Sequence, residues 1–117
     1  MTLADVCGIL NAKVLVGKEY LDREVKSAFA SDMMSDVLAF PKDYSILLTG
    51  LCNPQVIRTA EMLDIGCIIF VRGKQPTKDI LDMARALGLV ILETEQKMFF
   101  SCGMLYQAGL RGGSLDE

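Results

Sequence analysis

The sequence predicts a single α/β domain with a mostly parallel sheet flanked by helices. From residue 46 onward, short apolar runs alternate with segments of helical periodicity. Strands joined by helices of this length indicate right-handed crossovers and parallel pairing. The run 67–71 is apolar on both faces, as expected for a central parallel strand. The 117 residues, 51% hydrophobic and 23% charged, are typical of one globular domain.

The N-terminal part is expected to begin with a helix and two strands. Thr2 can cap a helix over 3–10, and Asp5 stands three positions later, where a capping box needs its second acceptor. Short strands are predicted over 13–16 and 25–30 because β-branched and aromatic residues alternate there with small or polar ones.

The remainder is expected to consist of helices that alternate with buried strands. Asn53-Pro54 is a strong helix start, because Asn caps well and Pro suits the first turn. Thr77 is predicted to cap the next helix, which Gly88 ends. The predicted strands are 46–49, 67–71 and 89–92, and the other predicted helices are 33–40, capped by Ser31-Asp32 and stopped by Pro41, and 95–108. Ile80, Leu81, Ala84 and Leu87 are expected to face inward from the Thr77 helix.

Composition excludes several classes of function. The net charge of −3 argues against binding duplex nucleic acid, which requires a basic face. The chain has no His, so histidine-based catalysis and the commonest zinc sites are excluded. Its four cysteines form no C-x-x-C motif and are expected to be buried free thiols in a reducing cytoplasm. No signal peptide or membrane span is evident. We therefore expect a soluble cytoplasmic protein with no cofactor, no metal, no membrane and no nucleic-acid partner.

Polar residues that follow the predicted parallel strands form a candidate anion site. Ligands of open α/β sheets collect where strand ends lead into helix N-termini, and a free N–H group there attracts negative charge. The predicted ligand-binding residues are Thr49, Gly50, Asn53, Arg72, Gly73 and Lys74. The alternative is that Asn53 is only a cap, that the glycines only form turns, and that the two cations only face solvent.

A second polar cluster consists of Asp32, Ser35 and Asp36. Two carboxylates within one helical turn can bind Mg²⁺ or act as an acid–base pair. The alternative is that Asp32 caps the helix and Asp36 faces solvent. Cys52 precedes a helix whose dipole favours a lower pKa of its thiol. Nucleophilic catalysis there nevertheless has little support, because no His is present to act as base, and a redox-sensing thiol is the better of these two readings.

The predicted last helix carries apolar residues on more than one face, including Phe99, Phe100 and Tyr106. A helix that is apolar nearly all round is usually buried, and in so small a domain a partner must supply part of the cover. We therefore expect a homodimer through this C-terminal helix. The alternative is a core helix that the domain itself covers.

Several stretches together resemble a stand-alone DRTGG domain, over nearly the whole chain. They are Ser31 to Leu38, Leu48-Thr49-Gly50, Asn53-Pro54-Gln55, the run 67–73 and Lys74-Gln75-Pro76. The family's Asp-Arg is replaced near Leu51-Cys52, and of its Thr-Gly-Gly only Gly73 matches. The resemblance implies a compact α/β module, similar in fold to the N-terminal domain of HPr kinase/phosphorylase, with a regulatory ligand-binding role.

These observations predict a DRTGG-like domain over 1–110 and a flexible tail over 111–117. We expect a non-enzymatic regulatory module that senses a small anionic metabolite or nucleotide, or that docks on a partner enzyme or kinase. The alternative is a protein–protein interaction and dimerisation module with no small-molecule ligand. A small enzyme is the third reading, and the poor inventory of acid–base groups disfavours it.

Overall fold

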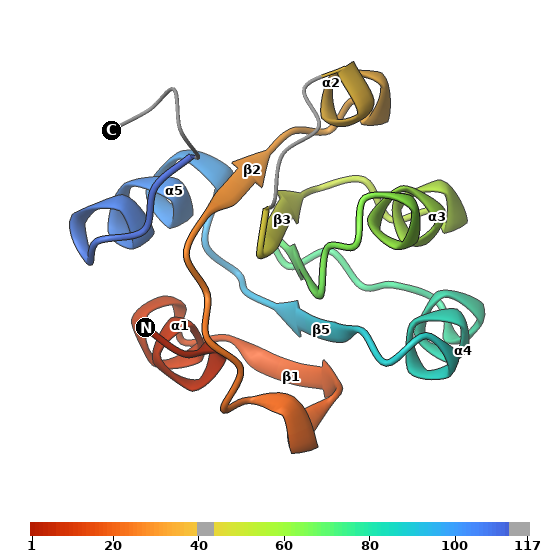
Figure 1. Ribbon diagram of the computed structural model, residues 1–117, viewed down its shortest axis with the longest axis horizontal. Coiled ribbons are helices and arrows are strands. Elements are labelled where there is room, and N and C mark those ends of the chain that lie inside the picture. Colours follow the sequence, from red (N-terminus) through yellow and green to blue (C-terminus); the bar gives the residue numbers. More distant parts are fainter. Residues whose placement is uncertain (40–43, 113–117) are drawn as a thin grey trace.

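In the computed structural model, which describes residues 1–39 and 44–112, a five-stranded sheet lies between two layers of helices (Figure 1). The strands are β1 (Lys13–Val16), β2 (Ala28–Ala30), β3 (Ile46–Thr49), β4 (Cys67–Phe70) and β5 (Val90–Glu93). The helices are α1 (Leu3–Leu10), α2 (Met34–Ala39), α3 (Pro54–Met62), α4 (Lys78–Ala86) and α5 (Met98–Gln107), with a short 3₁₀ helix η1 (Lys18–Tyr20). Helices α1 and α5 cover one face of the sheet, and α2, α3 and α4 cover the other.

The strand order is β1-β5-β4-β3-β2. Strands β2, β3, β4 and β5 are parallel, and only the edge strand β1 pairs in the antiparallel sense, with β5. The predicted mostly parallel sheet with flanking helices is therefore confirmed. All four parallel strands end at the same edge, which we call the carboxyl edge.

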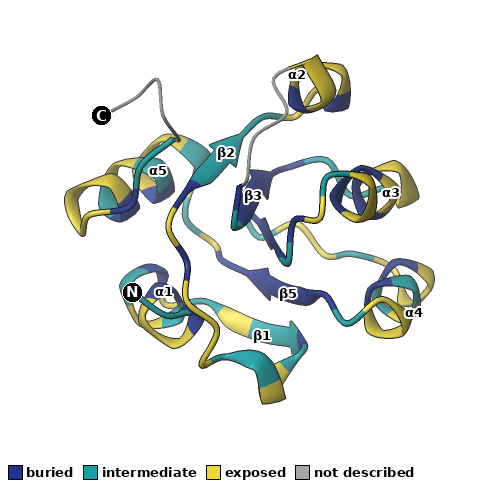
Figure 2. Ribbon diagram, in the orientation of Figure 1, coloured by how far each residue is buried: buried dark blue, intermediate teal, exposed yellow. Residues whose placement is uncertain are grey.

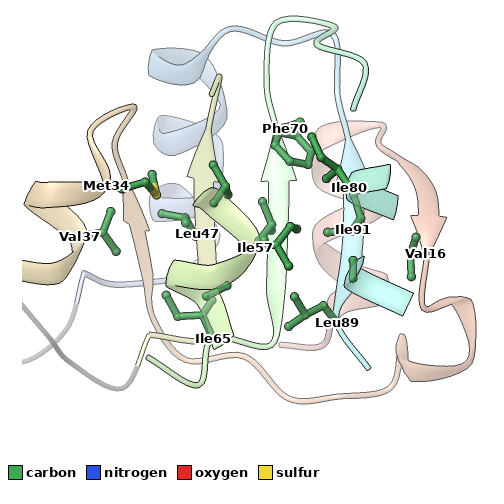
Figure 3. Close-up of a cluster of buried hydrophobic side chains, with 14 of the residues drawn as sticks. Val16, Met34, Val37, Leu47, Ile57, Ile65, Phe70, Ile80, Leu89 and Ile91 are labelled. Atoms are coloured by element: carbon green, nitrogen blue, oxygen red, sulfur yellow. The ribbon is translucent and has the colours of Figure 1, made fainter. Parts of the chain in front are cut away.

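Burial on both faces explains the continuous apolar runs of the central strands (Figure 2). Alternate residues point to opposite faces, so Leu47 and Ile91 pack toward α3 and α4, where Ile57 and Ile80 meet them (Figure 3). Ile69 and its neighbours on the other face pack against α1 and α5. The sheet thus has two separate hydrophobic cores.

Two of the predicted helix caps are present. At α1 the Thr2 hydroxyl accepts from the Asp5 N–H and the Asp5 carboxylate accepts from the Thr2 N–H, which completes the capping box. Asn53 Oδ1 accepts from the Gln55 N–H at 3.0 Å and caps α3. Thr77 stands at the N-cap of α4, but its side chain makes no capping hydrogen bond.

Several predicted boundaries are wrong by a few residues. Strand β2 is shorter than 25–30, and α5 begins at Met98, after two residues of bend. Leu87 was expected to face inward, but it ends α4 and is 41% exposed. The predicted helix 33–40 is α2, and its last residue and Pro41 lie outside the described residues.

The predicted tail begins at Arg111, which the structure places against β2. The Arg111 carbonyl accepts from the Ala28 N–H at 2.9 Å, and its guanidinium stacks on the Tyr106 ring at 4.1 Å. Residues 113–117 lie outside the described part of the chain. Within the described part, no helix is long and apolar enough to cross a bilayer.

Candidate functional site

Strand register aligns the last residues of the central strands at the carboxyl edge. Thr49 pairs with Phe70, and Phe70 pairs with Glu93, so these residues form one row across β3, β4 and β5. Thr49 and Glu93 are both buried, although each carries a polar side chain. The loops that follow these strands therefore start from two buried polar groups.

The Asp32 carboxylate comes from the neighbouring loop, between β2 and α2, and lies over the end of β3. Its Oδ1 accepts from the Gly50 N–H at 2.6 Å and from the Thr49 hydroxyl at 3.3 Å. Its Oδ2 lies 3.6 Å from Arg72 Nη2. We call the Gly50 N–H, the Thr49 hydroxyl and the Arg72 guanidinium the donor cluster. These three groups from two loops converge on one carboxylate.

The backbone conformation at Arg72 directs its side chain toward Gly50. Arg72 has φ of 62° and Gly73 has φ of 69°, so both occupy the left-handed region, which costs a non-glycine residue energy. The Arg72 N–H donates to the Gln96 carbonyl at 2.8 Å and the Gly73 N–H donates to the Thr94 carbonyl at 2.9 Å. The loop after β5 thus fixes the turn after β4.

Only glycine fits at position 50 without moving the arginine. A Cβ built on Gly50 would overlap Arg72 Nη2, so the guanidinium lies directly against the backbone there. The Thr49 hydroxyl also accepts from the Leu51 N–H at 3.0 Å, which orients it. The close approach is a reason for Gly at this position that the strand-end pattern alone does not reveal.

The six residues of the predicted anion site do not all act together. Thr49, Gly50 and Arg72 make up the donor cluster, and Gly73 forms the turn that positions it. The Asn53 side chain is engaged as the cap of α3. Lys74 is exposed and lies near Cys52, whose thiol it influences electrostatically.

The predicted second cluster separates in the structure. Asp32 belongs to the donor cluster, whereas Ser35 and Asp36 are exposed on α2, where no described residue bonds to their side chains. Across residues 1–39 and 44–112, no group of three or more acidic or cysteine side chains is close enough to hold a metal ion.

Sequence reasoning missed a buried glutamate at this edge. Glu93 ends β5, is 4% exposed, and accepts a hydrogen bond from the Gln75 side chain. A charged residue directly after the apolar run 89–92 is the signal that would have found it. Its pairing with Phe70, which in turn pairs with Thr49, places a buried carboxyl group at the carboxyl edge.

The thiol of Cys52 is not activated, in agreement with the little support that the sequence offers for nucleophilic catalysis there. Burial raises the pKa of its thiol; Lys74 acts in the opposite sense and Glu93 raises the pKa further. Burial also raises the pKa values of Cys7, Cys102 and, most strongly, Cys67. All four cysteines are free, and burial disfavours the thiolate form of each, so none has the lowered pKa of an activated nucleophile.

The fold is a three-layer α/β domain, and at the ends of its parallel strands three donor groups surround the carboxylate of Asp32. The model of the DRTGG domain family matches residues 5–108, and the chain belongs to that family. The resemblance noted in the sequence is thereby confirmed.

One solved structure with the same fold is the crystal structure of the CBS and DRTGG domains of the regulatory region of Clostridium perfringens pyrophosphatase, complexed with the activator diadenosine tetraphosphate. It superposes with a TM-score of 0.71 over 92% of this chain, at 16% identity. The present chain spans 46% of that structure. A search of curated protein sequences gave no significant match.

Proposed function

We propose that this domain is a non-enzymatic regulatory module that senses a small anionic metabolite or nucleotide through the donor cluster. The observation that carries the proposal is the position of Asp32. The Gly50 N–H and the Thr49 hydroxyl donate to one oxygen of this carboxylate, and the Arg72 guanidinium lies 3.6 Å from the other. Hydrogen bonds to a charged acceptor are stronger than neutral ones. Groups that hold a carboxylate in this way also suit a phosphate.

Family membership supports a regulatory role. The Clostridium perfringens structure with the same fold is part of a regulatory region and is complexed with a nucleotide activator. At 16% identity the likeness carries only the fold, so the ligand of that protein serves here as a chemical suggestion. It favours nucleotides and other phosphate esters as the first compounds to test.

The chemistry of the chain supports a role without catalysis. No His is present, and burial raises the pKa of every cysteine thiol. The chain therefore has neither histidine, the usual general base, nor an activated cysteine nucleophile. Free thiols also support our placement of the protein in the reducing cytoplasm.

Calorimetric titration with inorganic phosphate, AMP, acetyl phosphate and diadenosine tetraphosphate tests the proposal. We expect the wild-type protein to bind at least one of them. The variant Arg72→Gln should bind about tenfold or more weakly, because hydrogen bonds to charged groups contribute roughly 1.5–3 kcal/mol. Arg58→Gln is the matched control, since Arg58 is exposed on α3 and makes no ion pair with any described residue.

A second variant tests the same site without removing a charge. Gly50→Ala should displace the guanidinium and weaken binding, while the fold stays intact because the overlapping atom is the end of a flexible side chain. If none of the four compounds binds at millimolar concentration, the proposal is wrong and docking on a partner protein becomes the better account.

We further propose a homodimer through α5. Phe99 is 93% exposed on this helix, and Phe100 and Tyr106 are each about half exposed. Aromatic side chains on one helix can pair with their own copies about a two-fold axis, which is the commonest oligomer symmetry. Sedimentation velocity at increasing concentration should show a dimer that Phe99→Ser weakens. Met62→Ser is the control, because Met62 is also a largely exposed apolar side chain, at 71%, but lies in the opposite layer.

A further inference from the structure

We propose that Asp32 is an internal anion that occupies the donor cluster until a phosphate group replaces it, and that its replacement loosens the packing of α2. This inference rests on the proposed function and specifies how the same site is regulated. The ligand group it requires is a phosphate ester or free phosphate.

Asp32 keeps other anions away from the Gly50 N–H and the Thr49 hydroxyl. Gly50 has one N–H, and that group donates to Asp32 Oδ1 at 2.6 Å. The Thr49 hydroxyl has one hydrogen, and it is directed at the same oxygen. The Arg72 guanidinium closes the space above Gly50. An incoming anion can use the Gly50 N–H and the Thr49 hydroxyl only after Asp32 has left them, whereas the guanidinium has further N–H groups to offer.

The contacts of Asp32 make it replaceable. Its side chain is 48% exposed and that of Arg72 is 46% exposed, and the ion pair between them is long at 3.6 Å. Ion pairs between groups this exposed contribute roughly 0–1 kcal/mol. A released carboxylate regains its hydration at once. The hydrogen bond to Gly50 is therefore the main contact that a ligand has to replace.

A phosphate group is better suited than a carboxylate to take this position. It carries a charge of about −1.5 to −2 at neutral pH and offers three acceptor oxygens. Asp32 meets Gly50 and Thr49 with one oxygen and Arg72 with the other. A phosphate can give each donor an oxygen of its own. Phosphate compounds should therefore bind more tightly than carboxylates such as acetate.

Movement of Asp32 is coupled to α2 because a single residue, Met33, separates them. Before Asp32, the Ser31 N–H donates to the Leu48 carbonyl at 3.0 Å and keeps the end of β2 on the sheet. After it, α2 is six residues long and buries only Met34 and Val37 among its described side chains. A helix that buries so few side chains unfolds locally with a small increase in free energy. Release of Asp32 is thus expected to loosen α2 and to leave β2 in place.

The variant Asp32→Asn separates the charge from the contact. Asparagine keeps an Oδ1 that accepts from Gly50, but a neutral hydrogen bond is about half as strong as a charge-assisted one. We expect this variant to bind AMP and inorganic phosphate about tenfold more tightly than the wild-type protein. Asp36→Asn is the matched control, because it removes the same charge from exposed α2 without touching the donor cluster. Its affinity should stay within about twofold.

Amide hydrogen exchange of the wild-type protein supplies a readout that needs no variant. Saturating AMP should accelerate exchange in residues 34–39 and leave β3 and β4 unchanged. The inference is overturned if AMP binds but exchange in α2 is unaffected, or if Asp32→Asn binds no more tightly than Asp36→Asn. Either result leaves the proposed function intact. If neither the wild-type protein nor Asp32→Asn binds any phosphate compound, the proposed function fails together with this inference. Should Asp32→Asn not fold, the exchange experiment decides alone.

Discussion

Helices α3 and α5 lie on opposite faces of the same sheet and use their apolar residues differently. In α3 the residues Val56, Ile57 and Ala60 form one stripe, and all are fully buried. In α5 apolar residues occur on every side, yet Leu105 is the only large side chain among its buried residues. Figure 2 shows the outer side of α5 exposed.

The difference shows what apolar content means for a helix on a sheet. One face of a sheet can cover one stripe of a helix, and a second stripe stays exposed whatever its composition. The polar residues of α3 indicate which side of that helix faces solvent. In α5 no stripe of polar residues indicates the solvent-facing side. An evenly apolar helix therefore predicts an uncovered surface as well as a buried one.

The largest expected effect on the free energy of unfolding comes from a substitution in the buried stripe of α3. Ile57 is fully buried in the core between α3 and the sheet. The substitution Ile57→Ala should lower the free energy of unfolding by about 2–5 kcal/mol, through lost burial and the cavity left behind. Urea denaturation measures this. A loss below about 1 kcal/mol would contradict the packing described for α3.

Helix caps give the next contrast between the two layers. Thr2→Ala removes one half of the capping box of α1 and should cost about 1 kcal/mol. Thr77→Ala in α4 is the control, because the Thr77 side chain makes no capping bond. Its cost should be within a few tenths of a kcal/mol by the same principle. Equal losses in thermal or urea unfolding would show that the capping box contributes nothing special.

Acidification should remove the stability that the Asp5 carboxylate contributes to the capping box of α1. Hydrogen bonds from Thr2 hold the pKa of Asp5 below its ordinary value. A lowered folded-state pKa gives stability that is present above the unfolded value, about 3.9, and is lost as pH falls through the folded value. The stability difference between the wild-type protein and Asp5→Asn should therefore shrink below pH 4. A difference that grows on acidification would refute this assignment.

The smallest effect on stability is expected on the exposed side of α5. Phe99→Ser should change the free energy of unfolding by less than about 0.5 kcal/mol when measured at low protein concentration. The same substitution should weaken self-association, as proposed above. A loss of several kcal/mol in the monomer would mean that Phe99 packs inside the domain, which would remove the contrast with α3.

Much of the fold could be predicted because local signals and global architecture agree. The Asn53-Pro54 start, the doubly apolar run at 67–71 and the helix–strand alternation each predict the element that the structure contains. The antiparallel partner of β1 was not predictable. Pairing across the sheet depends on contacts between β1 and β5, which are distant in sequence.

The candidate site could be predicted only in part for the same reason. Thr49, Gly50 and Arg72 follow adjacent parallel strands, and strand ends can be located in the sequence. Asp32 joins them because β2 lies beside β3, and the strand order is not evident from local patterns. From the sequence, Asp32 was therefore assigned to a different polar cluster from Thr49, Gly50 and Arg72. In the structure its carboxylate lies among these three residues.

The two edges of the sheet bear on how this protein avoids aggregation. At one edge β1 is short, its register with β5 is interrupted between Val14 and Val16, and Lys13 is exposed. At the other, β2 is three residues long and Arg111 already accepts from its Ala28 N–H. Short, irregular or occupied edges resist the strand-to-strand stacking that leads to amyloid. Copies of this domain that meet in a crowded solution thus have little opportunity to extend the sheet by pairing their edge strands. We expect contacts between copies to involve the helices instead.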